Sequence, residues 1–143
     1  MRLTMQTDYA LRVLMFLATR TERATVADVA SLFDISANHV AKVVNLLSRY
    51  GYIHSTRGVG GGIELARQPQ SIRIGEVIQR MEGDLHLLSC TGTDESCQIH
   101  AFCRLRGVLA EAERVQQEYL DEVTLADVVP TRRQLNRFRH SDP

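Results

Sequence analysis

A glycine-rich run, Arg57-Gly58-Val59-Gly60-Gly61-Gly62, separates two short segments, 52–56 and 63–66, that are rich in strand-forming residues. Two such segments joined by a tip that tolerates positive φ angles predict a β-hairpin. A flexible loop without a partner is the alternative. A phosphate-binding glycine loop is disfavoured, because a strand and not a helix follows the glycines.

Helix-forming segments precede this hairpin. Apolar residues recur at helical spacing over 7–18, where Thr7 is positioned to cap the helix, and again from residue 25, where Thr25 and Asp28 form a capping-box pair. After a turn at 33–36, Ser36 is expected to cap a third helix that reaches about residue 50 and ends at Gly51. Two helices joined by a short turn predict a helix-turn-helix, and a hairpin directly after it is a wing.

The chain after the wing divides into a helix over 74–81 that ends at Gly83, an irregular stretch, a long amphipathic helix over 104–122 and a short capped helix at 124–127. The expected fold is mostly α with a small β-hairpin wing: a winged helix-turn-helix followed by a long C-terminal dimerisation helix. We expect a DNA-binding domain over 1–83, a cysteine loop over 84–103, dimerisation and terminal helices over 104–129, and a disordered tail over 130–143. The long helix needs an apolar surface to cover it, either a partner subunit or its own winged domain.

Charge is distributed unevenly along a chain whose formal net charge is zero. The interval between Asp34 and Glu64 contains no acidic residue, whereas eleven acidic residues face four arginines from Glu76 to Asp127. A cationic half suits phosphates, although ordinary patchiness is the alternative. The second helix of a helix-turn-helix reads bases with its N-terminal residues, and a wing contacts the backbone or the minor groove. The residues expected to contact DNA are therefore Ser36, Ala37, Asn38, His39, Lys42, Arg57, Gly60 and Gly61.

The three cysteines follow the spacing Cys90-x6-Cys97-x5-Cys103. Zinc sites usually contain closer cysteine pairs, and longer loops suit an iron–sulfur cluster, whose ligands are thiolates. Structural zinc with His100, or three unrelated thiols, remains an alternative. Three thiolates leave one ligand missing, and the candidates are Asp8, Asp94, Glu95, His86, His100 or an exogenous thiol. Arg104 and Arg106 follow the last cysteine and are expected to offset the charge of a cluster.

Other classes of protein are disfavoured by the sequence. No apolar stretch of about 18 residues and no signal-peptide core is present, so we expect a cytoplasmic protein with no membrane partner. No catalytic pattern is found, so we expect that the chain is not an enzyme. An electron-transfer protein that uses the cluster is the alternative from another class.

The motifs together resemble the Rrf2 family of bacterial winged-helix regulators over roughly residues 1–129. The motifs that carry the resemblance are Met1-Arg2-Leu3-Thr4, Thr7-Asp8-Tyr9-Ala10-Leu11-Arg12, Arg57-Gly58-x-Gly60-Gly61-Gly62 and the three cysteines. Within the family the chain is most similar to the nitric-oxide-sensing repressors, through the segment from Cys97 to Arg106. A subgroup that has a histidine three residues after its last cysteine is disfavoured, because Arg106 occupies that position here.

The resemblance implies a homodimer that binds double-stranded DNA at a palindromic operator. It also implies a [4Fe-4S] cluster, favoured over [2Fe-2S], whose ligands are Cys90, Cys97, Cys103 and Asp8 of the partner subunit. Nitric oxide is the implied signal: its attack on the cluster, or loss of the cluster, would release the DNA. An iron- or redox-responsive regulator of the same family remains the alternative.

Overall fold

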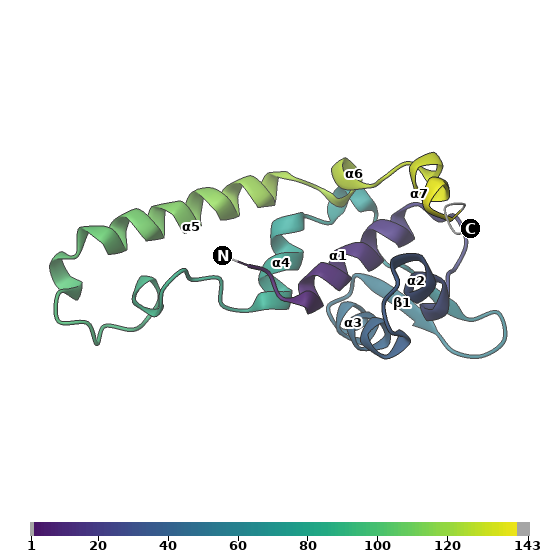
Figure 1. Ribbon diagram of the computed structural model, residues 1–143, viewed down its shortest axis with the longest axis horizontal. Coiled ribbons are helices and arrows are strands. Elements are labelled where there is room, and N and C mark those ends of the chain that lie inside the picture. Colours follow the sequence, from purple (N-terminus) through teal and green to yellow (C-terminus); the bar gives the residue numbers. More distant parts are fainter. Residues whose placement is uncertain (1, 140–143) are drawn as a thin grey trace.

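The structure, a computed structural model, describes residues 2–139 and places five elements in the expected winged-helix order (Figure 1). These elements are α1 (Met5–Ala18), α2 (Val26–Phe33), α3 (Ala37–Arg49), β1 (Ile53–Thr56) and β2 (Gly62–Leu65). Thr4, and not Thr7 as expected, caps α1, because the Thr4 hydroxyl accepts a hydrogen bond from the Thr7 N–H at 3.3 Å. The expectation was wrong because the side chain of Thr7 is buried and bonded elsewhere.

Local signals set the helix-turn-helix as expected. Thr25 and Asp28 form a reciprocal capping box at the start of α2, and Asp34 ends that helix with a left-handed φ of 52°. The Ser36 hydroxyl accepts from the His39 N–H and caps α3. Gly51, with φ of 81°, follows the end of α3 and turns the chain toward β1.

β1 and β2 pair antiparallel, with Ile53 opposite Leu65 and Thr56 opposite Gly62, and they form the wing. Gly62 lies against the backbone of Ala24, where an added Cβ would come within 2.6 Å of the Ala24 carbonyl oxygen. A bridge between Ala24 and Ile63 extends the hairpin toward the turn before α2. Only glycine permits such a close approach of the two backbones, so the glycine-rich run determines how the wing packs against Ala24 as well as the shape of its tip.

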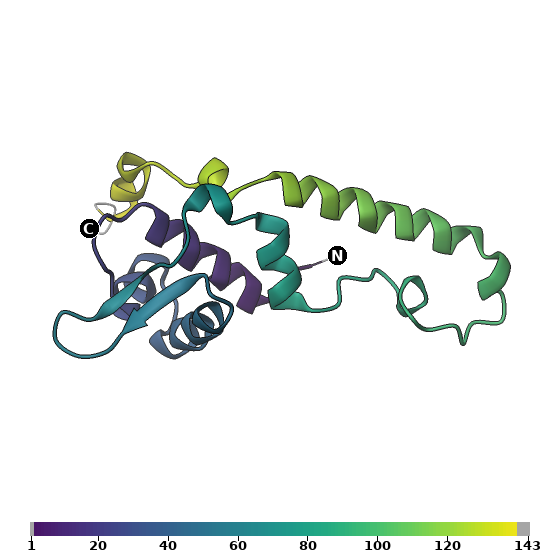
Figure 2. The same ribbon diagram turned by 180° about the vertical axis from the view of Figure 1, so that it is seen from behind.

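The core lies where α1, α2 and α3 meet α4 (Ile74–Glu82), with the wing against one side (Figures 1 and 2). Its largest fully buried side chains are Tyr52, Phe16, Leu14, Leu47, Ile72 and Leu125. Leu125 belongs to the short helix α6 (Leu125–Val128). Its N–H donates to the Ile72 carbonyl oxygen at 2.8 Å, which attaches α6 to the winged domain. Short 3-10 turns complete the connections at η1 (Pro69–Ser71), η2 (Ser89–Thr91) and η3 (His100–Phe102).

The loop over 84–103 runs outward from the end of α4, and α5 (Arg104–Glu122) returns beside it toward the winged domain, so that the two form a projecting arm (Figures 1 and 2). The arm is joined to α4 at its C-terminal end. Gly75 of α4 is buried there, and an added Cβ would lie 2.1 Å from Asp121 Oδ1 of α5. In the part of the chain that the structure describes, no helix combines the length and apolar character that crossing a membrane requires.

The tail differs from the disorder expected over 130–143. Arg132–Arg139 forms a helix, α7, and the remaining four residues lie outside the described part of the chain. The helix begins with a capping box that the sequence expectation overlooked, in which Thr131 and Gln134 exchange hydrogen bonds. Arg132 also donates to the Thr19 carbonyl oxygen at 2.9 Å and joins α7 to the end of α1.

Candidate functional site

The N-terminal turn of α3 presents the predicted reading residues on one exposed face. Its inner face is buried through Val40, Val43, Val44 and Leu47. The outward residues, all exposed, are Ser36, Ala37, Asn38, His39 and Lys42. The structure therefore brings these five residues together on a helix face that offers an amide, an imidazole and an ammonium group to a ligand.

The wing contributes a second exposed surface, and its glycines differ in role. Arg57 and Gly60 are exposed, and Val59 at the tip is an apolar residue fully open to solvent. The Gly61 N–H already donates to the Gly58 carbonyl oxygen at 3.0 Å. An added Cβ on Gly61 would lie 2.3 Å from the Thr56 carbonyl oxygen. Gly61 therefore shapes the wing turn, and its amide is not free for a phosphate.

Asp8 lies in the first turn of α1, half-exposed, and forms an ion pair with Arg12 at 2.8 Å. Arg12 in turn lies over the ring of Phe33 in α2, with its guanidinium carbon 5.8 Å from the ring centroid. Tyr9, the neighbour of Asp8, places its ring 6.1 Å from that of His39 in α3. The two residues beside Asp8, Tyr9 and Arg12, therefore contact both helices of the helix-turn-helix.

Glu82 fixes this first turn to the end of α4. Its carboxylate accepts hydrogen bonds from the Thr4 N–H at 2.7 Å, from the Thr4 hydroxyl at 3.0 Å and from the Thr7 hydroxyl. Burial opposes ionisation of Glu82, but the bonds from Thr7 and Thr4 outweigh it and lower the pKa of the carboxyl group. The turn that carries Asp8 is thereby bonded to the end of α4, two residues before the cysteine loop begins at Asp84.

The cysteines all lie in the loop between α4 and α5 and carry free thiols. Cys90 is half-buried in η2, Cys97 is exposed, and half-buried Cys103 directly precedes α5. Within residues 2–139, no three or more Cys, His, Asp or Glu side chains are assembled in the geometry of a metal site. The loop therefore supplies the expected donors without holding them in a preformed cage.

The other candidate ligands are placed less favourably. His86 is bonded to Glu113 at 3.0 Å, and Asp94 accepts from the Ser96 N–H at 2.9 Å. Glu95 is exposed. His100 has a buried Nε2 with no hydrogen-bond partner among the described residues.

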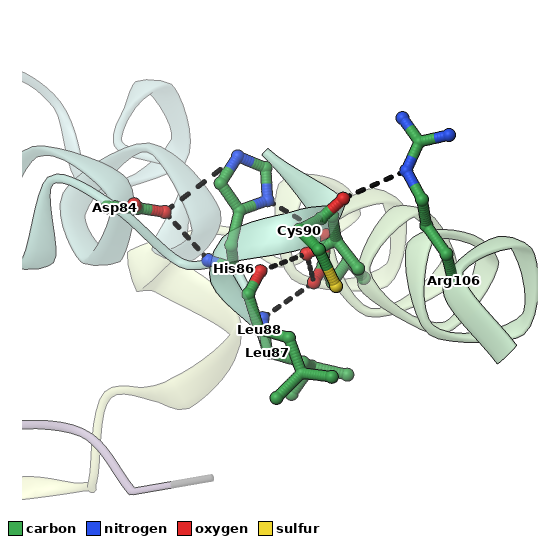
Figure 3. Close-up of polar contacts among 8 residues, drawn as sticks. Asp84, His86, Leu87, Leu88, Cys90 and Arg106 are labelled. Atoms are coloured by element: carbon green, nitrogen blue, oxygen red, sulfur yellow. Dashed lines mark hydrogen bonds and ion pairs between the residues drawn. The ribbon is translucent and has the colours of Figure 1, made fainter. Parts of the chain in front are cut away.

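The donor set nevertheless fits a thiolate-bound iron–sulfur cluster. Arg106 Nε donates to the Cys90 carbonyl oxygen at 2.8 Å, so the backbone of Cys90 lies beside the first turns of α5 (Figure 3). Cys103 occupies the position that caps the same helix, and no side chain bonds to the free N–H groups there. A helix N-terminus and an arginine both stabilise negative charge, which thiolate ligands bring. Arg106 thus reaches the backbone of the cysteine loop, and that it offsets the charge of a cluster stays a prediction.

An apolar stripe runs along the exposed side of α5. Its members recur every three or four residues and are Leu105, Val108, Ala112, Val115 and Tyr119. The four larger side chains of this set are between 52% and 66% exposed. Spacing of this kind matches the a and d positions of a coiled-coil seam.

Sequence reasoning missed Glu82 and Glu113, which both hold the cysteine loop or its base in place. Glu113 had a weak signal, because an acidic residue on the loop-facing side of an amphipathic helix requires a partner. Glu82 had none, since its partners Thr4 and Thr7 lie 75 or more residues away along the chain.

Comparison with known proteins gives a consistent picture. The profile of the Rrf2 family, described as an iron-dependent transcriptional regulator, matches residues 3–131. A protein of Bacillus licheniformis named HTH-type transcriptional regulator NsrR is 42% identical over 132 residues, which cover 90% of this chain and 92% of the relative. A protein of the same name from Bacillus subtilis is 39% identical and covers 96% and 97%. These relatives are transcriptional regulators and not enzymes, as the sequence led us to expect.

Solved structures share the fold. CymR, described as the global cysteine regulator of B. subtilis, superposes with a TM-score of 0.74 at 22% identity, covering 90% of this chain and 96% of CymR. IscR of T. potens gives a TM-score of 0.72 at 22% identity, covering 100% and 94%. The predicted winged-helix fold is confirmed.

Proposed function

This chain belongs to the Rrf2 family of transcriptional regulators, and from that premise we propose that it is a cytoplasmic, DNA-binding repressor controlled by an iron–sulfur cluster. The observation that carries the proposal is the position of three free thiols in one loop, which runs beside α5 and follows Glu82, the residue bonded to the first turn of α1. Nitric oxide is the signal that we propose for release of the DNA, since the segment from Cys97 to Arg106 resembles that of the nitric-oxide-sensing repressors of this family.

The DNA-binding half of the proposal rests on α3 and the wing. With α3 in the major groove, Asn38 can pair bidentately with adenine and Lys42 can reach guanine or a phosphate. Arg57 at the base of the wing suits the narrow minor groove or the backbone. Gly61 acts indirectly, because it sets the turn that carries Arg57 and Gly60.

A second copy of this chain is the proposed occupant of the apolar stripe on α5. The stripe is continuous over about four helical turns, and its four larger side chains are more than half exposed in the described chain. Two copies that pair through this seam would present two reading helices to a palindromic operator, with half-sites about one helical turn (~34 Å) or a small multiple apart. The seam supports a homodimer over packing against the chain's own winged domain, from which the arm projects (Figure 2).

The residues that would hold the cluster are Cys90, Cys97 and Cys103, with Asp8 of the partner subunit as fourth ligand. A [4Fe-4S] cluster, favoured over [2Fe-2S], would supply iron that reacts with nitric oxide and is weakly held by one carboxylate ligand. Two features of the chain support Asp8: its carboxylate is half-exposed, and its ion pair with Arg12 lies on the surface, where such pairs contribute little stability.

The chain's own contacts offer a route from Asp8 to the DNA. Tyr9 contacts His39 of the reading helix, and Arg12 lies over Phe33 of α2. A change in the position of the first turn of α1 would therefore alter its contacts with both α2 and α3, the helices proposed to face the operator. A regulator of this kind needs two arrangements of this turn that differ in DNA affinity.

The proposal is tested by purifying the protein without oxygen and measuring its absorption spectrum, iron and acid-labile sulfide. We expect a coloured protein with iron and sulfide in equal amounts, and loss of both in Cys90→Ser, Cys97→Ser and Cys103→Ser variants. Gln98→Ala, an exposed change in the same loop, is the matched control and should keep the cluster. A colourless wild-type protein with one tightly bound zinc ion per chain would contradict the proposal.

A further inference from the structure

We propose that Glu113 is a positioning residue that holds the Cys90 segment on α5 and so presents the Cys90 thiolate to the cluster. This inference rests on the proposed function, and it adds a residue outside the ligand set. Glu113 lies on α5, 23 positions beyond Cys90 and ten beyond Cys103, with its side chain 15% exposed.

The carboxylate of Glu113 binds both sides of Cys90. Oε1 accepts from the Leu87 N–H and from the Thr91 hydroxyl, each at 2.6 Å. Oε2 lies 3.0 Å from His86 Nδ1. Three donors from a six-residue stretch therefore converge on one carboxylate, and Cys90 lies within that stretch (Figure 3).

Arg106 completes the attachment on the same helix. It donates to the Cys90 carbonyl oxygen at 2.8 Å, and it precedes Glu113 by seven residues, which is two helical turns and hence the same face. Hydrogen bonds from the Thr91 hydroxyl and from His86 lower the pKa of Glu113 to about 2, so the carboxylate is ionised at neutral pH. An ionised acceptor makes hydrogen bonds stronger than a neutral one does.

The Cys97 segment lacks such an attachment. Among the described residues, the hydrogen bonds of residues 93–99 all go to the loop itself, as from the Ser96 N–H to Asp94 and from the His100 N–H to the Cys97 carbonyl oxygen. The backbones of two of the three cysteines are therefore held against the N-terminal half of α5 before any cluster binds, Cys103 by the chain and Cys90 by Glu113 and Arg106. Cys97 is left to close over the cluster.

The experiment compares wild type, Glu113→Ala, Glu113→Gln and Glu111→Ala. Glu111 is the matched control, because it is an exposed glutamate on the same helix that pairs with Arg114 and, within residues 2–139, makes no hydrogen bond to the loop. Hydrogen exchange of the peptide that contains Leu87 to Thr91 is measured in cluster-free protein. The rate of cluster loss to a chelator and the visible circular dichroism of the cluster are measured in loaded protein.

Loss of the carboxylate in Glu113→Ala should speed exchange of this peptide about tenfold or more, since two hydrogen bonds are removed. It should also speed cluster loss and change the visible dichroism. Glu113→Gln, which keeps one acceptor oxygen and the same shape, should restore part of each property, and Glu111→Ala should match wild type.

Failures of the inference and of the proposed function are distinguishable. A wild-type protein that takes up no iron and sulfide overturns both. A wild type that takes up the cluster, with unchanged exchange in Glu113→Ala or with unchanged cluster loss and dichroism, overturns the positioning role and leaves the proposed function standing. If Glu113→Ala does not fold, Glu113→Gln decides, and a Gln variant identical to wild type in cluster loss and dichroism counts against the carboxylate.

Discussion

Val115→Asp should separate the proposed dimer into monomers that remain folded. Val115 is the fourth member of the apolar stripe on α5 and is 52% exposed in the single chain. Because about half of the side chain is already open to water, an aspartate there leaves the monomer's own packing nearly unchanged. The change instead places a carboxylate in the seam where the second copy is proposed to lie.

The expected magnitude follows from the area that dimerisation would cover. Full burial of a valine side chain contributes about 1.5 to 3 kcal/mol, so the exposed half contributes ~0.8 to ~1.5 kcal/mol. A two-fold interface contains the same residue twice, which gives ~1.6 to ~3 kcal/mol per dimer. That corresponds to an increase in the dimer Kd of about 15-fold to 150-fold. Desolvation of the two carboxylates adds to this figure, so it is a lower limit.

Sedimentation equilibrium over a range of protein concentrations measures this change. Ala110→Asp is the matched control, because Ala110 is exposed on the opposite side of the helix from the stripe and the substitution adds the same charge. We expect the control to dimerise like wild type and to have the same thermal unfolding as Val115→Asp. Equal dimer Kd values for Val115→Asp and wild type would refute the assignment of the seam.

The remaining predictions concern the reading head and the packing that supports it. Asn38→Ala should cost ~1 to 3 kcal/mol of binding free energy on operator DNA and little on unrelated DNA, and equal losses on the two DNAs would exclude base reading. Arg57→Ala should weaken binding to both DNAs alike and lower the slope of log K against log salt by about 1. Fluorescence anisotropy at several salt concentrations measures both effects. The folded-state pKa of Glu82 lies below its ordinary value of 4.5, so its contribution to stability is fully present above that pH and is lost as the pH falls through the folded-state pKa. The Glu82→Gln variant should therefore unfold at a lower urea concentration at neutral pH, and its free energy of unfolding should fall less steeply as the pH is lowered. A free energy of unfolding that falls toward acid pH as steeply as in wild type would contradict the role of this carboxylate. Gly75→Ala should cost ~1 to 3 kcal/mol of unfolding free energy, because the new Cβ would lie 2.9 Å from the backbone nitrogen of Asp121 in α5, which cannot rotate away as the Asp121 side chain can. Gly107→Ala, a helical position with open space, should cost nothing and is the control.

The parts of the fold that the sequence predicted are those with local causes. The capping pair of Thr25 and Asp28, the Ser36 cap and the left-handed Gly51 all act within four residues of the position that they define. The same kind of signal was present at Thr131 and Gln134, where the basic composition of the tail led to an expectation of disorder. Local hydrogen bonds decided the outcome there as well.

Contacts between distant segments could not be predicted from one sequence. Nothing local to Glu82 indicates that its acceptor atoms serve the first turn of α1, and nothing local to Glu113 indicates that its partners are Leu87 and Thr91. The candidate ligands were readable as a pattern of cysteines, but their arrangement was not. In the proposed function the cluster itself would assemble the thiolates, and the described chain contributes the position of Cys103 at the start of α5 and the attachment of Cys90 to that helix.

The central claim is that the cluster controls the affinity for DNA. It is tested most directly by measuring the operator affinity of one preparation in three forms at a single salt concentration. The forms are cluster-loaded, cluster-loaded and then exposed to nitric oxide, and cluster-free. We predict tight binding by the loaded form and a loss of tenfold or more in the other two, in the range of about 1 to 3 kcal/mol typical of coupling between sites. Equal affinities for the three forms would contradict the account.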